Sequence, residues 1–138
     1  MKALTLTQPW STLVALGVKK IETRSWSTPY RGRLAIHAAK GFPPDARLIC
    51  RREPFKRVLM AAGIESLADL PLGVLLATVQ LVDCVPTGEV RSRLSSEEYA
   101  FGDYSIGRWA WLLDDVQPLS EPVPARGALG LWDCSTLL

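Results

Sequence analysis

The sequence predicts an α+β fold that is mainly β, a small barrel of about six strands with short peripheral helices. Segments in which apolar and polar residues alternate with period two recur along the chain, whereas helical spacing is confined to short stretches. Ten prolines and ten glycines are scattered between these segments, which keeps the elements short. We expect links without crossovers, so a closed or nearly closed barrel is favoured over a parallel βαβ sheet because closure removes edges.

The first half of the chain is predicted to hold three strands and one helix. Residues 3–7 alternate, so Leu4, Leu6 and Gln8 share a face. Pro9 suits the first turn of a helix that ends at Gly17. The other strands are predicted over residues 20–24 and 33–39, and the Pro- and Gly-containing turn at 28–32 is compatible with a hairpin.

The second half begins with helical spacing over residues 44–62, which Pro54 divides into two short helices. Residues 73–85 are rich in Val and Leu on both faces and are predicted as a central strand. Ser95 or Ser96 can cap a short helix that runs through Tyr99. The last strands are predicted over 108–116 and 127–134.

Length and composition favour a single domain over residues 1–138. The three cysteines form no C-x-x-C pair, and the sequence has no P-loop, dinucleotide fingerprint, zinc motif or nucleophile elbow. We therefore expect neither a metal nor a cofactor. No apolar run approaches the roughly 18 residues of a membrane span, so no membrane association and a cytoplasmic location are expected.

Charge is distributed unevenly along the chain. Residues 1–60 contain 12 Lys or Arg and 3 Asp or Glu, whereas residues 61–138 contain 4 and 11. Such asymmetry would produce a basic groove for phosphates unless folding interleaves the two halves.

The densest group of charged residues follows the predicted helix end at Gly17. In a strand, Lys20, Glu22 and Arg24 share one face, and a turn at residues 18–19 would bring Lys19 beside Glu22. These residues then form either a binding or catalytic cluster or a solvated strand with one weak ion pair.

Aromatic residues lie close to these cations in the sequence. Trp10, Trp26 and Tyr30, together with Arg24 and Arg33, are the residue types that grip single-stranded nucleic acid or a nucleobase, although core packing explains aromatics equally well. The single histidine, His37, lies in a predicted strand, where a structural hydrogen-bonding role is the more frequent one.

The pattern Gly17-x-Lys19-x-x-Glu22-x-Arg24 resembles the signature of the ASCH superfamily, named for the activating signal cointegrator 1 homology domain. The likeness extends over nearly the whole chain and is greatest to the cointegrator-type branch. It includes residues 8–10, 30–33, 36–40, 101–104, 107–108 and 130–132. The resemblance implies a PUA-like β-barrel with a cleft for RNA or a modified nucleoside.

Family members differ in activity, because some resemble RNA-binding or coregulator modules and others act as N4-acetylcytidine amidohydrolases or ribonucleases. In the amidohydrolase branch the motif lysine acts with a threonine three positions later and with a later glutamate. This chain has Glu22 at the threonine position, and Glu98 or Glu97 would be the later glutamate. The resemblance therefore makes Lys19, Glu22 and Glu98 the catalytic candidates of a metal-independent hydrolase.

The leading expectation is an RNA- or nucleotide-binding module with a cationic cleft. The alternatives are a hydrolase acting on an acylated nucleoside or on RNA and, more weakly, a protein-interaction or coregulator module. The sequence leaves the oligomeric state open. The binding candidates are Gln8, Trp10, Arg24, Trp26, Tyr30, Arg33, His37, Lys40 and Arg108.

Overall fold

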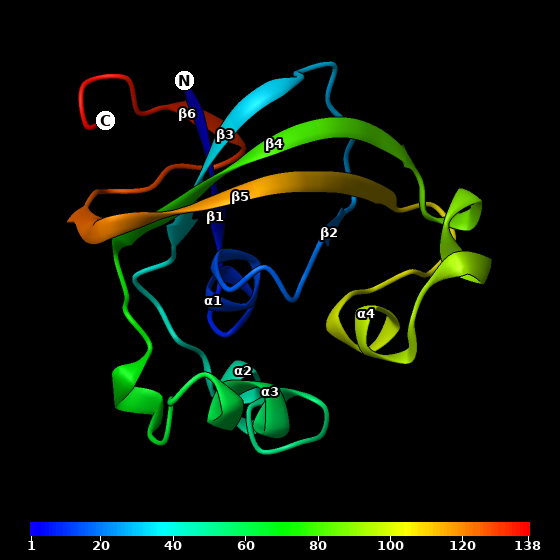
Figure 1. Ribbon diagram of the computed structural model, residues 1–138. Coiled ribbons are helices and arrows are strands. Elements are labelled where there is room, and N and C mark those ends of the chain that lie inside the picture. Colours follow the sequence, from blue (N-terminus) through cyan, green and yellow to red (C-terminus); the bar gives the residue numbers. More distant parts are fainter.

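A computed structural model describes residues 1–138 and contains one six-stranded sheet with the order β2-β5-β4-β3-β1-β6 (Figure 1). The strands are β1 (Lys2–Leu6), β2 (Ile21–Arg24), β3 (Gly32–Ala38), β4 (Val74–Pro86), β5 (Trp109–Pro124) and β6 (Leu131–Asp133). The sheet curls, but its end strands β2 and β6 do not pair with each other. The mainly β prediction is confirmed, and the barrel is a half-barrel.

Four short α-helices lie on the concave side of this sheet (Figure 1). They are α1 (Trp10–Ala15), α2 (Pro44–Ile49), α3 (Phe55–Ala61) and α4 (Ser96–Phe101). Helix α1 lies directly against the sheet, while α2 and α3 form a separate layer below it. The break at Pro54 is confirmed, and so is the cap of α4, where the Ser95 hydroxyl accepts a hydrogen bond from the Glu98 N–H.

The predicted hairpin between the second and third strands is wrong. β2 pairs with β5, whereas β3 lies between β4 and a parallel β1, so this connection is a crossover. The segment between β2 and β3 is held beside β5 because the ring of Trp26 packs edge to face on the ring of Trp111, with 4.8 Å between the ring centroids. The Trp26 carbonyl also accepts a hydrogen bond from the Trp111 indole.

The last two strands also differ from their predicted lengths. β5 continues through Pro118 to Pro124, because register shifts in its pairing with β4 accommodate prolines that appear in the sequence as strand breaks. β6 is shorter than predicted because residues 127–130 form a loop. Within that loop Gly127 lies against Thr5 and His37.

The interior is divided between the half-barrel and the helical layer. The first cluster gathers around Trp111, and its members are Leu4, Leu6, Val14, Leu34, Ile36, Val79, Leu81, Trp111 and Leu113. The second fills the helical layer with Leu13, Cys50, Phe55, Leu59, Leu70 and Phe101. Trp10 packs against both clusters and so lies where the two layers meet.

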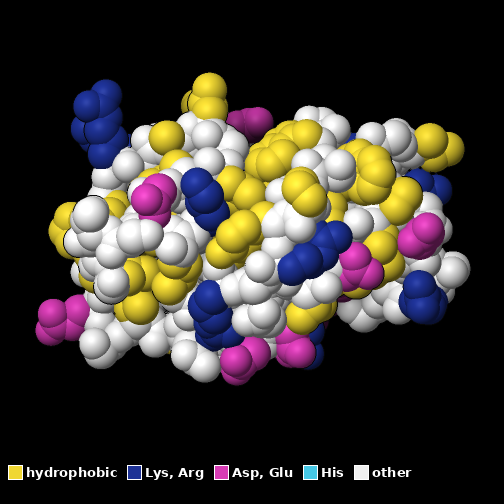
Figure 2. Space-filling model, turned by 90° about the horizontal axis from the view of Figure 1, so that it is seen from above, with side chains coloured by type: hydrophobic (Ala, Val, Ile, Leu, Met, Phe, Trp, Pro, Cys, Tyr) yellow, Lys and Arg dark blue, Asp and Glu magenta, His cyan; other side chains and the backbone are white.

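Folding interleaves the two oppositely charged halves of the chain. Arg31 pairs with Asp83, and Arg33 pairs with Asp115 at 3.1 Å. On the face shown in Figure 2, dark blue cations and magenta anions alternate among apolar side chains. The uneven charge of the sequence therefore does not give this face a continuous basic surface. None of the helices has the length and apolar character needed to cross a membrane.

Candidate functional site

A tight turn after α1 turns the chain inward at Lys19. Gly17 adopts a positive φ of 78°, which costs little without a Cβ, and the N–H groups of Val18 and Lys19 both bond to the carbonyl of Leu13. The lysine side chain is consequently buried completely, although lysine is rarely found in that state.

The buried ammonium of Lys19 is satisfied by two oxygens. Its Nζ donates to the carbonyl of Ile21 and lies 3.4 Å from Oε1 of Glu22. The turn thus places Lys19 beside Glu22, the arrangement that the sequence allowed but strand alternation alone would not produce.

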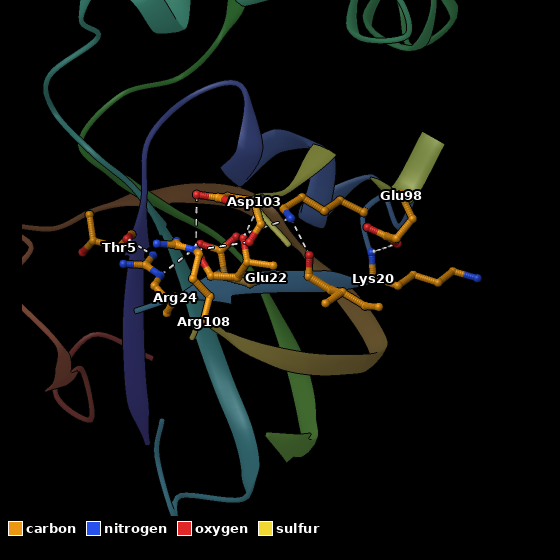
Figure 3. Close-up of polar contacts among 10 residues, drawn as sticks. Thr5, Lys20, Glu22, Arg24, Glu98, Asp103 and Arg108 are labelled. Atoms are coloured by element: carbon orange, nitrogen blue, oxygen red, sulfur yellow. Dashed lines mark hydrogen bonds and ion pairs between the residues drawn. The ribbon is translucent and has the colours of Figure 1, made fainter. Parts of the chain in front are cut away.

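Glu22 connects this buried ion pair to Arg24 on the same strand. Its Oε2 accepts a hydrogen bond of 3.0 Å from Nε of Arg24, whose Nη2 donates to the carbonyl of Thr5 at 2.7 Å (Figure 3). Arg24 is thereby held in one orientation, and its Nη1 has no hydrogen-bond partner in the protein.

A second arginine lies next to Arg24 because β2 and β5 are antiparallel neighbours. Arg24 pairs with Trp109, so Arg108 stands at the adjacent position. Arg108 donates from Nε to the Asp103 carbonyl and from Nη2 to the Thr23 carbonyl, and its Nε lies 3.5 Å from Oδ2 of Asp103 (Figure 3). Its Nη1 also has no protein partner.

Both arginines line a cavity of about 430 Å³ between the half-barrel and the helices. The other lining residues are Thr5, Leu6, Thr7, Trp10, Glu22, Thr23, Ile49, Ala100, Phe101, Gly102 and Asp103. Two cations and two carboxylates thus share the cavity wall, and the ammonium of Lys19 lies buried behind Glu22. The cavity is less cationic than the sequence suggested.

Gly102 brings the Asp103 segment onto β2. A Cβ at Gly102 would lie 2.9 Å from Cε2 of Tyr104 and 3.2 Å from Cγ2 of Thr23, so only glycine fits without displacement. The Asp103 N–H then donates to the hydroxyl of Thr23. Hydrogen bonds from the Ser105 hydroxyl and N–H lower the pKa of Asp103, which keeps this carboxylate ionised.

Glu98 lies on the opposite side of the Lys19 turn and does not line the cavity. Its Oε1 accepts a hydrogen bond of 2.8 Å from the Lys20 N–H, and its Oε2 is buried without a partner (Figure 3). Burial raises the pKa of Glu98, against the opposing effects of that hydrogen bond and of the Lys19 charge. Glu97 instead pairs with Arg57 at 3.0 Å, so Glu98 is the glutamate near Lys19.

Tyr104 is the second buried group near these carboxylates that lacks a partner. Its hydroxyl makes no hydrogen bond within the protein. Burial, followed by the charges of Glu98 and Glu22, raises the pKa of Tyr104, so the phenol stays neutral.

Of the other predicted binding residues, only Trp10 lines the cavity beside Arg24 and Arg108. Gln8 is fully buried, donates to the Pro71 carbonyl and accepts from the Thr12 N–H, which is a structural arrangement. Trp26 and Tyr30 pack against the half-barrel core. The guanidinium of Arg33 bonds to Asp115 and Thr78, away from the cavity.

His37 and Lys40 line a different cavity, of about 1120 Å³, formed with residues 124–129. His37 is buried, and its Nε2 must donate to the Ala125 carbonyl at 2.8 Å because a carbonyl only accepts. In the neutral ring, Nδ1 then accepts from the hydroxyl of Thr5. This pattern agrees with the structural role expected of a lone histidine in a strand.

No role was predicted for Asp103, Thr5 or Thr7, all of which line the cavity. Asp103 could have been predicted as a site residue, because its motif, Phe101-Gly102-Asp103-Tyr104, lies close to Arg108 in the sequence. The two threonines had no such signal, since their strand appears in the sequence as ordinary alternation.

Comparison with known proteins points to one family. The ASCH domain family matches residues 4–122. Activating signal cointegrator 1 from Mus musculus and from Homo sapiens are each 30% identical over 129 residues, which cover 94% of this chain and 21% of theirs. The chain therefore spans about a fifth of the length of these curated relatives.

Solved structures agree on the fold. The crystal structure of ASCH from Zymomonas mobilis has a TM-score of 0.53 and 20% identity, covering 89% of this chain and 72% of that one. A mutant of the same bacterial protein gives a TM-score of 0.52 and 19% identity, covering 89% and 74%. At this level of identity the likeness establishes the architecture alone.

Proposed function

Because the chain belongs to the ASCH domain family, we propose that it binds RNA, with one nucleotide held in the cavity between the half-barrel and the helices. The observation that carries the proposal is the arginine pair. Arg24 and Arg108 are both fixed by backbone carbonyls, and each keeps Nη1 unpaired at the same cavity. Guanidinium groups held in this way are suited to a phosphate.

The carboxylates of the cavity favour a nucleotide over a bare polyanion. Glu22 and Asp103 would repel a chain of phosphates, but they accept hydrogen bonds from the amino groups of a base. Trp10 offers an aromatic surface on which that base can stack. The wall thus matches a ligand that has one anionic end and one end that donates hydrogen bonds.

The test is the affinity of wild-type protein and arginine variants for a short single-stranded RNA. We expect Arg24→Gln and Arg108→Gln each to weaken binding by about tenfold or more, because each removes a charge-assisted hydrogen bond. Arg31→Gln is the matched control, since that arginine pairs with Asp83 outside the cavity. With two phosphate contacts, the slope of log affinity against log salt is about −1.4.

Equal losses in all three variants would show that net charge, and not the cavity, governs binding. A wild-type protein without RNA affinity at low salt would overturn the proposal and favour the weaker alternative of a protein-interaction module.

The contact between Lys19 and Glu22 favours a second candidate, a hydrolase acting without metal on an acylated nucleoside or on RNA. Glu22 lines the cavity and would accept a proton from water, while Lys19, buried behind it, would act as a positioning residue. Glu98 is separated from the cavity and has no direct part in this scheme.

This second candidate predicts release of acetate and cytidine from N4-acetylcytidine or metal-independent cleavage of RNA. Glu22→Gln should abolish the turnover, and Glu97→Gln, which alters a carboxylate paired with Arg57, should not. Turnover that survives in Glu22→Gln would exclude this mechanism.

A further inference from the structure

A second cavity, with aromatic side chains in its wall, lies directly beside the cavity proposed for the nucleotide. It is a cavity of about 460 Å³ that shares Gly102 and Asp103 with the first one. The remaining lining residues are Arg91, Tyr99, Tyr104, Ser105 and Ile106. Because the two cavities share residues 102–103 in their walls, a single-stranded RNA bound in the first cavity would pass over these residues into the second cavity.

The floor of this second cavity is a stacked pair of tyrosines. Tyr99 lies on Tyr104 with 5.9 Å between ring centroids and 14° between ring planes. Tyr104 is buried, whereas Tyr99, within α4, is 56% exposed. One face of Tyr99 is thus held by a buried ring while much of the side chain remains open to solvent, an arrangement that gives a stacking platform without the usual entropy cost of ordering it.

The platform is flanked by one group that suits a phosphate, Arg91, and one that suits a base, Asp103. The guanidinium of Arg91 is fixed on the Tyr104 carbonyl through Nε and Nη2, and no carboxylate lies within ion-pairing distance of it. Asp103, which lines both cavities, is ionised and can accept a hydrogen bond from the exocyclic amino group of a base. The exposed Ile106 adds an apolar side to the pocket.

We propose that this second cavity holds the adjacent nucleobase of a bound single strand, stacked on Tyr99. The inference rests on the proposed function, since the nucleotide in the first cavity delivers the neighbouring base to the platform. Adenine is favoured over uracil, because it stacks over a larger area and has an amino group that can reach Asp103.

Calorimetric titration with 5′-AMP and with the trinucleotides of adenosine and uridine separates the two cavities. We expect wild-type protein to bind the adenosine trinucleotide more tightly than either AMP or the uridine trinucleotide. Tyr99→Ala should weaken trinucleotide binding roughly 5- to 100-fold, the range for loss of one stacked base, and leave AMP binding unchanged.

Two further variants control this comparison. Tyr99→Phe keeps the ring and should retain trinucleotide binding, and Leu48→Ala removes a similarly exposed apolar side chain on α2 and should have no effect. Thermal unfolding of each variant reports whether it is folded.

Three results would overturn the inference alone: unchanged trinucleotide affinity in Tyr99→Ala, an equal loss of AMP affinity in that variant, or a loss in Tyr99→Phe as large as in Tyr99→Ala. Wild-type protein that binds neither AMP nor either trinucleotide would overturn the proposed function together with the platform.

Discussion

Lys19 is the residue whose surroundings differ most from those its type prefers. Its ammonium is removed from water and retains only the carbonyl of Ile21 and the carboxylate of Glu22. Burial of such a pair stabilises little by itself, but removal of one partner leaves the other charge poorly compensated. Lys19 therefore holds Glu22 in place at the edge of the cavity.

Replacement of Lys19 by Met tests this role. We expect Lys19→Met to lower the free energy of unfolding by about 3 kcal/mol, the lower end for breaking a buried pair because Glu22 keeps Arg24. Lys20→Met, at the exposed neighbouring position, should change it by less than about 0.5 kcal/mol. Urea denaturation measures both values, and equal effects would contradict the burial argument.

We expect Glu98 to make the stability of the folded protein depend on pH. Its pKa in the folded state is raised above the ordinary value of 4.5, so the folded protein holds this proton more tightly than the unfolded chain. The resulting stabilisation is complete below pH 4.5 and is lost as pH rises through the folded-state pKa. Glu98→Gln cannot ionise, so its stability relative to wild type should increase from below pH 4.5 to neutrality.

Thermal unfolding of wild type and Glu98→Gln across this range measures the difference. Glu97→Gln is the control. Glu97 pairs with Arg57, whereas the buried carboxylate oxygen without a partner belongs to Glu98. Parallel curves of melting temperature against pH for wild type and Glu98→Gln would contradict a raised pKa for Glu98.

At the level of elements, the loop before β6 shows how closely the chain packs where the sequence suggested a strand. A Cβ at Gly127 would lie 2.7 Å from Oγ1 of Thr5 and 2.8 Å from two atoms of the His37 ring. We expect Gly127→Ala to destabilise the protein by about 1–3 kcal/mol, as overpacking does.

Gly88→Ala provides the comparison for this substitution, because a Cβ there meets no atom within 4 Å. Chemical denaturation should show a change below about 0.5 kcal/mol for Gly88→Ala. Similar stabilities for the two alanine variants would show that the loop yields to the added methyl group.

Local signals predicted most elements, and long-range packing decided their pairing. Pro54 marked the break between α2 and α3, and Ser95 marked the start of α4, because both effects are local. The connection that carries the chain from β2 to β3 brings Trp26 onto Trp111, 85 residues later, and no local pattern encodes that contact or the pairing of β3 with β1.

The candidate site was predictable to a similar extent. The signature identified Lys19, Glu22 and Arg24 because they are close in sequence, and the structure brings them into one chain of contacts. Asp103 and Thr5 enter the site only through the antiparallel contact of β2 with β5 and the path of β1, which the sequence pattern did not reveal.

In the whole molecule, a half-barrel and a helical layer each have their own apolar cluster, and the cavity proposed to hold a nucleotide lies where they meet. Trp10 packs against both clusters and also lines that cavity, so the contact between the layers and the cavity wall share one side chain. Opposite charges are interleaved on the face shown in Figure 2, so the proposed selection of a ligand rests on the fixed arginine pair and not on overall charge.

The location of bound nucleotide tests this account most directly. In an NMR titration of isotopically labelled protein with 5′-AMP, we predict saturable shifts of the Trp10 indole signal and of the amides of Glu22, Arg24, Asp103 and Arg108. Shifts that gather instead around His37 and Lys40, which line the other large cavity, or the absence of any saturable shift, would contradict it.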